Sequence, residues 1–256
     1  AEMGARGPAP NPAACTAAMA ACAAGLQWER ALAVLQDLQD GGLELEVEAC
    51  GAAVTACGRC GQWAAALWLL AEAQARNLAL GAVLCNAAVS ACEVCARWEE
   101  ALALLARMPA WGVTADVVTY SAAASACEKG GQWERALGLL EHMRWAGVQP
   151  AVIAYSAAIS ACDRSGRWQH AIELLRELQT LAGLLPNAIT YTAAISACSK
   201  AAKADLALEL LDEMRASSLD VGTITLCMAI GACSSHEQAD RVPPLLRSLE
   251  LEAWRQ

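Results

Sequence analysis

The chain has 256 residues and a formal net charge of −9; 57% of its residues are apolar and 18% are charged. This balance excludes an intrinsically disordered chain, because disorder requires low hydrophobicity and a high density of charge. No apolar run reaches the roughly 20 residues that a membrane-spanning helix needs, so we expect no membrane association.

The first apolar stretch, Ala13–Leu26, allows two interpretations. Its length suits the apolar part of a secretory signal. However, Cys22 and Trp28 fall in phase with residues that recur throughout the chain, which favours the first helix of a repeat. We expect residues 1–11 to be an irregular segment, and no targeting segment is visible.

One cysteine position recurs along the whole chain, at intervals of 35 residues with a single insertion near Ala182. A sustained period of this length predicts stacked units that do not fold well alone. The recurring cysteines are Cys22, Cys57, Cys92, Cys127, Cys162, Cys198 and Cys233. They divide the chain into units 12–46, 47–81, 82–116, 117–151, 152–187, 188–222 and a partial unit 223–256.

Each unit contains two helical patterns. In the fourth unit, apolar residues between Tyr120 and Cys127 recur at helical spacing, Gly130-Gly131 breaks the pattern, and a second amphipathic run follows from Trp133 to Met143. The threonines that precede the first pattern are candidate N-caps: Thr119, Thr190 and Thr225. No segment alternates with period two. We therefore predict an all-α fold, a single right-handed superhelical solenoid of about seven helix–turn–helix repeats over residues 12–256.

The repeated cysteine and tryptophan positions each have a structural and a functional interpretation. A cysteine in every unit behaves as a small buried hydrophobe and indicates a reduced compartment. Cys57-x-x-Cys60 and Cys92-x-x-Cys95 resemble two halves of a zinc site, but the shared position favours the core, and we expect no metal and no cofactor. A tryptophan row at the start of the second helices could stack on bases, but its helical phase favours packing between units. It comprises Trp28, Trp63, Trp98, Trp133 and Trp168.

The stretch "VVTYSAAASACEKGGQWERALGLLEHMRWAGVQPA" (Val117–Ala151) closely resembles the pentatricopeptide repeat, and so does "AITYTAAISACSKAAKADLALELLDEM" (Ala188–Met214). The resemblance extends from about residue 12 to the end of the chain. It implies a solenoid that binds single-stranded RNA and reads one base per repeat. It also implies an organellar location, in the chloroplast or mitochondrion.

In the family, the fifth residue of a unit and its last residue read the base together. Asn86 with Asp116 then implies uracil, and Ser156 with Asn187 implies adenine, since carboxylate and amide groups complement those base edges. The remaining pairs are less complete: Ser121 with Ala151, Thr192 with Gly222, Thr16 with Glu46, Gly51 with Gly81, and Cys227 with no clear partner. The implied site reads purine, any base, U, purine, A, purine.

Two further rows follow from the resemblance. The second residue of each unit packs against base faces: Val83, Val118, Ile153, Ile189 and Ile224, with Glu48 in unit two. Ordinary helix packing explains the same apolar residues. A cation near the end of each first helix meets phosphates: Arg59, Lys129, Arg164 and Lys200. These cations would equally complement the negative end of a helix.

The sequence therefore predicts selective binding of single-stranded RNA, serving organellar RNA processing, stability or translation, without catalysis. The histidines His142, His170 and His236 form no constellation with a nucleophile, and no glycine-rich phosphate loop is present. Acidic residues gather in the second helices, so a convex face could bind protein partners. The alternative is a helical-repeat scaffold that holds a peptide in its concave groove, which the net acidity and the Gly51/Gly81 unit favour.

Overall fold

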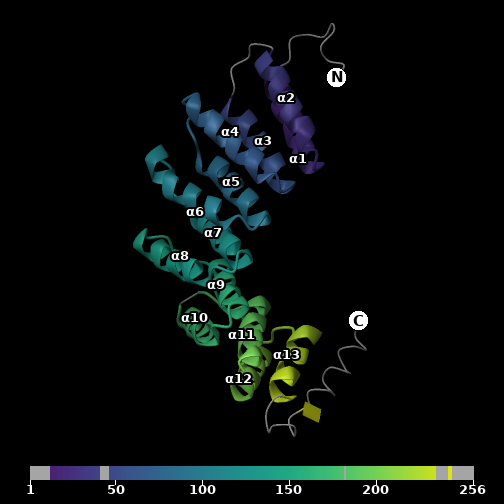
Figure 1. The fold of residues 1–256 in the computed structure, drawn as a ribbon, viewed down its shortest axis with the longest axis vertical. Coiled ribbons are helices and arrows are strands. Elements are labelled where there is room, and N and C mark those ends of the chain that lie inside the picture. The colour runs from purple at the N-terminus through teal and green to yellow at the C-terminus, as the bar shows by residue number, and fades with distance from the viewer. Residues whose placement is uncertain (1–11, 41–45, 182, 235–241, 244–256) are drawn as a thin grey trace. The chain divides into compact units, whose positions relative to one another are not determined.

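The computed structural model describes residues 12–40, 46–181, 183–234 and 242–243, and within these ranges the chain folds into helices without a strand (Figure 1). The first helices of the hairpins are α1 (Pro12–Ala24), α3 (Val47–Arg59), α5 (Ala82–Val94), α7 (Val117–Lys129), α9 (Val152–Arg164), α11 (Ala188–Lys200) and α13 (Thr223–Ser234). The second helices are α2 (Trp28–Asp40), α4 (Trp63–Ala75), α6 (Trp98–Arg107), α8 (Trp133–Trp145), α10 (Trp168–Thr180) and α12 (Ala204–Ala216). A 3-10 turn, η1 (Met108–Trp111), extends α6.

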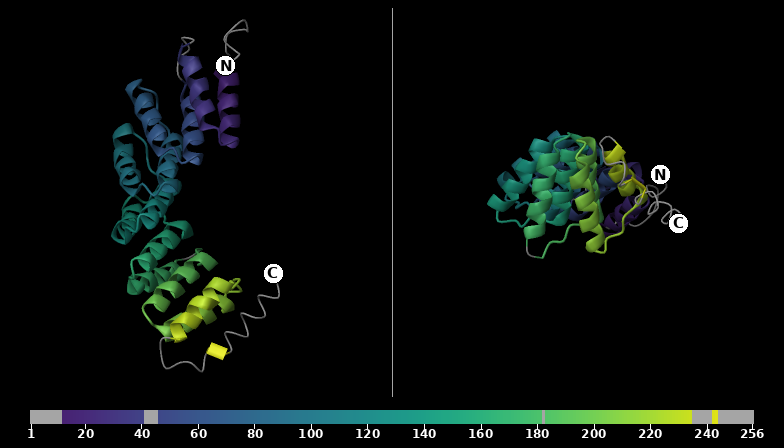
Figure 2. Two further views of the ribbon diagram at one scale, coloured as in Figure 1. Left: turned by 45° about the vertical axis from the view of Figure 1, so that its right-hand side comes forward. Right: turned by 90° about the horizontal axis from the view of Figure 1, so that it is seen from below.

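The structure divides into two compact units, Ala1–Ala126 and Cys127–Gln256, with the boundary inside α7. Within each unit the first helices pack side by side, as α1, α3 and α5 in one and as α9, α11 and α13 in the other (Figure 2). The second helices α2, α4, α10 and α12 each pack on their own first helix and on the next one, while α6 packs on α5 and α8 packs on α9. The predicted all-α stack of helical hairpins is confirmed.

Some expectations concern residues that the structure leaves out. Residues 1–11, Ala182, His236 and most of the partial unit beyond residue 234 lie outside the described residues. The expectation of one continuous domain over residues 12–256 stays a prediction. None of the described helices has the length and apolar character needed to cross a membrane.

The core of each stack is built from alanine in the first helices and leucine in the second. Ala88 and Ala158 are fully buried, so neighbouring first helices can approach closely. Leu140 and Leu175 on the second helices are also buried, and each such side chain contributes roughly 2 kcal/mol. The residues that form the apolar periodicity of the sequence are therefore the ones buried in this packing.

The recurring cysteine contributes to the structure through its buried side chain and through a backbone hydrogen bond. Burial raises the pKa of the Cys57 thiol to about 11 and that of Cys92 to about 12, so both stay protonated at neutral pH. The Cys57 carbonyl also accepts a 2.8 Å hydrogen bond from the amide of Gln62, which closes the first helix. Gly61 in that turn has φ +69°, the left-handed conformation that ends helices in this way.

The same closure recurs in other hairpins, and it sets the register of the second helix. The amide of Gln132 bonds the Cys127 carbonyl at 2.9 Å, and the amide of Lys203 bonds the Cys198 carbonyl at 2.9 Å. In the latter turn the left-handed residue is Ala202, at φ +54°, instead of glycine. A side chain there carries a local strain of about 1 kcal/mol.

The tryptophan row differs from the expectation of core packing, because these side chains are only half-buried. They lie at the first residue of the second helices, and three of them, Trp63, Trp133 and Trp168, are covered by a cation of the next hairpin. Arg97 lies over Trp63 at 4.4 Å from the ring centroid, and Arg167 lies over Trp133 at 5.0 Å. These three tryptophans therefore join neighbouring hairpins as expected, but through cation–π contacts at the surface.

Candidate functional site

Aliphatic side chains are exposed at the second position of five first helices, and we call this set the aliphatic row. Val83 is 81% exposed, Ile153 is 62% exposed and Ile189 is 65% exposed. Val118 and Ile224 share the position in their helices and are also exposed. Ordinary helix packing therefore does not explain this row. Each of these residues lies three positions before a proposed base reader, and residues at that spacing share one face of a helix.

The proposed uracil readers of the third repeat are in direct contact. Asn86 Nδ2 donates to both carboxylate oxygens of Asp116 at 3.1 Å. Thr119 joins them, because its hydroxyl donates to Asn86 Oδ1 and its amide donates to Asp116 Oδ1 at 2.9 Å. Asp116 is exposed and Asn86 is half-buried, so the free lone pair and the second amide hydrogen are accessible.

This arrangement corrects the expectation that Thr119 and Thr190 are N-caps. Asn187 is the N-cap of α11, and Thr190 lies at its third helical position in a reciprocal capping box. Asp116 and Thr119 bond each other in the same way at the start of α7. Asp116 and Asn187, the proposed second base readers of their repeats, therefore also cap the next helix.

Asp116 stays ionised throughout the neutral range. Its partial burial alone would raise the pKa of the carboxyl, but hydrogen bonds from the Thr119 amide, the Thr119 hydroxyl and the Asn86 amide together outweigh burial. The pKa of Asp116 is thus held below its ordinary value. The pair presents a fixed acceptor beside a fixed donor.

The fifth repeat differs from the third, because its first reader is enclosed. Ser156 is only 7% exposed, and its hydroxyl donates to the Val152 carbonyl at 2.8 Å and lies 3.2 Å from Thr190 Oγ1. Asn187 is half-exposed, and its Oδ1 accepts from the amide and the hydroxyl of Thr190. Accessible donors on this pair come from Asn187.

The remaining readers are not equally accessible. In the sixth repeat Thr192 is half-buried, its hydroxyl lies 2.9 Å from Thr225 Oγ1, and Gly222 is exposed. Ser121 is buried, and its Oγ is the one buried side-chain polar atom without a hydrogen-bond partner in the part of the chain that the structure describes. The chain carries Ala154 at the repeat position of Thr119, Thr190 and Thr225. The other proposed readers Thr16 and Ala151 are half-buried, and Glu46 is exposed.

The proposed phosphate-facing cations are partly neutralised by carboxylates. Lys200 Nζ lies 2.9 Å from Asp163 Oδ1, and Arg164 Nη2 lies 3.6 Å from Glu128 Oε1. Each of these acids comes from the first helix one repeat earlier. Arg59 is exposed and forms no ion pair among the described residues. At the acid's position one repeat before Arg59 the chain has Ala23.

The cysteine pairs do not gather into a metal site. Within the described ranges, no three or more His, Cys, Asp or Glu side chains are placed to share a metal ion. Cys95 Sγ instead donates to the Gly61 carbonyl at 2.9 Å, which joins two neighbouring hairpins. The second cysteine of this motif therefore has a packing role.

The fold defines a helical-repeat protein of stacked hairpins. The pentatricopeptide repeat domain model matches residues 103–164, and PPR repeat models match residues 83–113, 153–181 and 182–215. Together these matches cover more than half of the 256-residue chain. The chain belongs to the pentatricopeptide repeat family.

Solved structures share this fold. PPR10 in complex with an 18-nt PSAJ RNA element matches with a TM-score of 0.78 and 17% identity over 96% of this chain and 36% of that one. PPR10 from maize matches with a TM-score of 0.69 and 26% identity over 92% and 34%. The PPR domain of Arabidopsis thaliana protein-only RNase P 1, in complex with tRNA, matches with a TM-score of 0.62 and 19% identity over 71% and 95%.

The chain spans about a third of the length of the PPR10 chains that it matches. None of the curated proteins matches its sequence.

Proposed function

We propose that this chain binds single-stranded RNA along its first helices, with one base per repeat. The exposed aliphatic row is the observation that carries the proposal. Five exposed aliphatics at the same helical position are costly in water, and they can pack on base faces, which are apolar and planar. Beside each one, three residues later, stands a residue of the reading row.

The third repeat supports a preference for uracil. Asp116 offers a carboxylate lone pair to the imino hydrogen of the base, and Asn86 offers an amide hydrogen to a base carbonyl. Their mutual hydrogen bonds and the Thr119 bridge hold both groups in place before a base arrives. In the fifth repeat, adenine recognition would rest mainly on Asn187, because Ser156 is enclosed.

The similarity to PPR10 and to the PPR domain of protein-only RNase P 1, both solved with RNA, supports the same class of ligand. The proposed mode of action is binding alone, in organellar RNA processing, stability or translation. The partly neutralised cations support a modest affinity, because few phosphate charges would be compensated.

The test is fluorescence anisotropy with labelled short RNAs at low salt, about 50 mM. The reference RNA carries AAUAAA, and its counterpart carries C in place of U. We expect the wild-type chain to prefer U by about fivefold, the equivalent of about 1 kcal/mol. Asp116→Asn replaces an acceptor by a donor and should shift the preference toward C, whose ring nitrogen accepts.

Two controls separate base reading from general effects. Ile189→Ala should weaken binding to both RNAs equally, because stacking does not depend on the base. Glu99→Gln, on an exposed position of α6, should change neither affinity nor preference. Absence of RNA binding at low salt, or the same U preference in Asp116→Asn, contradicts the proposal and favours a peptide-binding scaffold.

A further inference from the structure

Grooves lie between the second helices of neighbouring repeats at two places, α4–α6 and α8–α10. The groove between α8 and α10 encloses a cavity of about 200 Å³. Leu137, Leu140 and Leu174 form its apolar part. The polar part of the lining consists of Glu141, Arg144, His170, Glu173 and Glu177. An apolar floor with a mainly acidic rim suits a long side chain with a cationic end.

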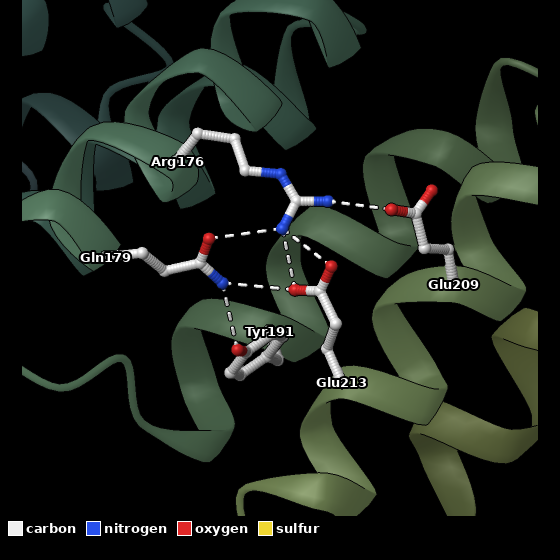
Figure 3. Close-up of polar contacts among 5 residues, drawn as sticks. All are labelled: Arg176, Gln179, Tyr191, Glu209 and Glu213. Carbon is white, nitrogen blue, oxygen red and sulfur yellow. Dashed lines mark hydrogen bonds and ion pairs between the residues drawn. The ribbon is translucent and has the colours of Figure 1, made fainter.

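Between the next two second helices, α10 and α12, lies such a side chain of the protein itself, that of Arg176 (Figure 3). Arg176 Nη1 donates to Glu213 Oε1 at 2.6 Å and to Oε2 at 2.7 Å, and Nη2 donates to Glu209 Oε1 at 3.2 Å. Gln179 Nε2 completes the cluster by donating to Tyr191 Oη at 3.1 Å and to Glu213 at 3.0 Å. A guanidinium thus joins two carboxylates from α12.

The α8–α10 groove repeats this cluster one unit earlier with two exchanges. Arg144 takes the place of Gln179 and donates to Tyr155 Oη at 2.9 Å, and Tyr155 donates to Glu177 at 2.8 Å. Arg144 also bonds Glu177 directly. Glu173 occupies the repeat position of Glu209. At the position of Arg176, however, the chain has Glu141.

The presence of Glu141 at the position of Arg176 leaves the α8–α10 groove with excess negative charge. Three carboxylates, those of Glu141, Glu173 and Glu177, face a single guanidinium, that of Arg144. Glu141 and Glu173 form no hydrogen bond or ion pair within the described residues, although Glu141 acts electrostatically on Arg144. Between α10 and α12, Arg176 forms ion pairs with Glu209 and Glu213, the carboxylates at the positions of Glu173 and Glu177.

We propose that the α8–α10 groove binds an arginine side chain of a partner protein. The methylene stem of that arginine packs on Leu137 and Leu174, and its guanidinium binds Glu141 and Glu173. The planar fork of a guanidinium matches carboxylates better than the ammonium of lysine does. The chain's own Arg176 provides the precedent for the ligand one repeat later.

An exposed tryptophan favours a protein as the source of the arginine. Trp145 is 92% exposed at the end of α8. It lies four residues after Glu141, so it shares the face of α8 that carries that carboxylate. Aromatic side chains are enriched at protein interfaces, where they supply most of the contact area.

The groove between α4 and α6 serves as an internal control. It encloses about 120 Å³ at the equivalent place two repeats earlier. Ala71, Ala103 and Arg107 replace Glu141, Glu173 and Glu177 there, and Arg107 Nη2 donates to Gln74 Oε1 at 3.2 Å. The carboxylate that lines this groove, Glu100, is paired with Arg97. The groove therefore has a similar shape without carboxylates at the positions of Glu141, Glu173 and Glu177.

The test is an NMR titration of the isotope-labelled full chain with the peptide acetyl-Leu-Arg-Leu-amide. Its counterpart contains citrulline, which has the same shape without the charge. We expect saturable amide shifts in α8 and α10 with the arginine peptide alone. Glu141→Arg fills the place with the chain's own guanidinium, as Arg176 does, and should weaken binding at least about tenfold. Glu173→Gln should weaken it without adding bulk.

Glu99→Arg is the matched control, because it makes the same change of charge on exposed α6, outside either groove. It should leave the titration unchanged. Equal binding of the citrulline peptide, shifts spread over all acidic helices, no shifts at all, or unchanged binding in Glu141→Arg each overturn the proposal. Because neither groove contains the RNA-facing row, RNA binding of Glu141→Arg should equal that of the wild type.

Discussion

Asn86 and Asp116 lie 30 residues apart in the chain, yet the Asn86 amide donates to both oxygens of the Asp116 carboxylate at 3.1 Å. The two residues belong to one repeat, but Asp116 caps the first helix of the next. A proposed base reader is thus fixed by the same hydrogen bonds that start the neighbouring helix. Under the proposed function, base recognition and hairpin stacking would share these residues.

This double role predicts a pH dependence of stability. The pKa of Asp116 in the folded state lies below its ordinary value of about 3.9, so the carboxylate stabilises the fold fully above that value. The stabilisation is lost as the pH falls through the folded-state pKa. We expect Asp116→Asn to be less stable than the wild type at pH 7 and equally stable once Asp116 is protonated. Urea unfolding at several pH values measures this, and a difference that is constant with pH contradicts it.

A second prediction concerns the turns between the helices of a hairpin. Ala202 holds φ +54° where the turn after α9 has Gly166 at φ +67°. Because a left-handed alanine costs about 1 kcal/mol, Ala202→Gly should stabilise the chain by about 0.5 kcal/mol after the entropy cost of glycine. Gly166→Ala is the reciprocal variant and should destabilise the chain by a similar amount, about 0.5 kcal/mol. Thermal unfolding checks both, and changes of the same sign would contradict this account.

Most of the fold was predicted from the 35-residue repeat and the helical spacing of apolar residues, because the apolar pattern of each helix indicates its buried face. The starts of the first helices at Val47 and Val117 coincide with the starts of the units inferred from Cys57 and Cys127. Contacts between repeats were harder to predict, since single-sequence patterns do not show which polar groups meet across a hairpin. The enclosure of Ser156 and the cations over Trp63, Trp133 and Trp168 belong to this class.

The salt bridges at the ends of the first helices were missed for the same reason. A signal was present, because an acid directly precedes the cation in "EK" and "DR", at Glu128 and Asp163. Only the stacked geometry shows that each acid binds the cation of the following repeat, as Asp163 binds Lys200. RNA phosphates would therefore have to compete with carboxylates of the chain itself for the predicted phosphate-facing cations.

That competition gives a third prediction, which rests on the proposed RNA binding. Asp163→Asn should release Lys200 and strengthen RNA binding about two- to fivefold at low salt, with a salt slope steeper by about one ion. Lys200→Gln alone should have little effect, because Asp163 already neutralises this lysine. Glu99→Gln controls for net charge. Anisotropy titrations over a range of salt concentrations measure the slope, and equal slopes for Asp163→Asn and Glu99→Gln contradict the prediction.

The second repeat offers the last prediction, since its reading positions hold Gly51 and Gly81. A Cβ at either position meets no atom within 4 Å, so both sites accept a side chain. Gly81 is the N-cap of α5 and makes no side-chain cap bond, so Gly81→Asp should also stabilise the helix by a few tenths of a kcal/mol. Gly51→Asn with Gly81→Asp reproduces the Asn86/Asp116 pair.

In AAUAAA the second base faces this repeat, and we expect the double variant to prefer U over C there by about threefold. The gain should be smaller than at the third repeat, because Leu84 replaces the bridging Thr119. Buried Leu84 leaves no hydroxyl to hold the new asparagine in place. A preference that appears at the third base instead would show that the assumed register of RNA along the repeats is wrong, whereas no preference at either position would contradict base reading by this pair.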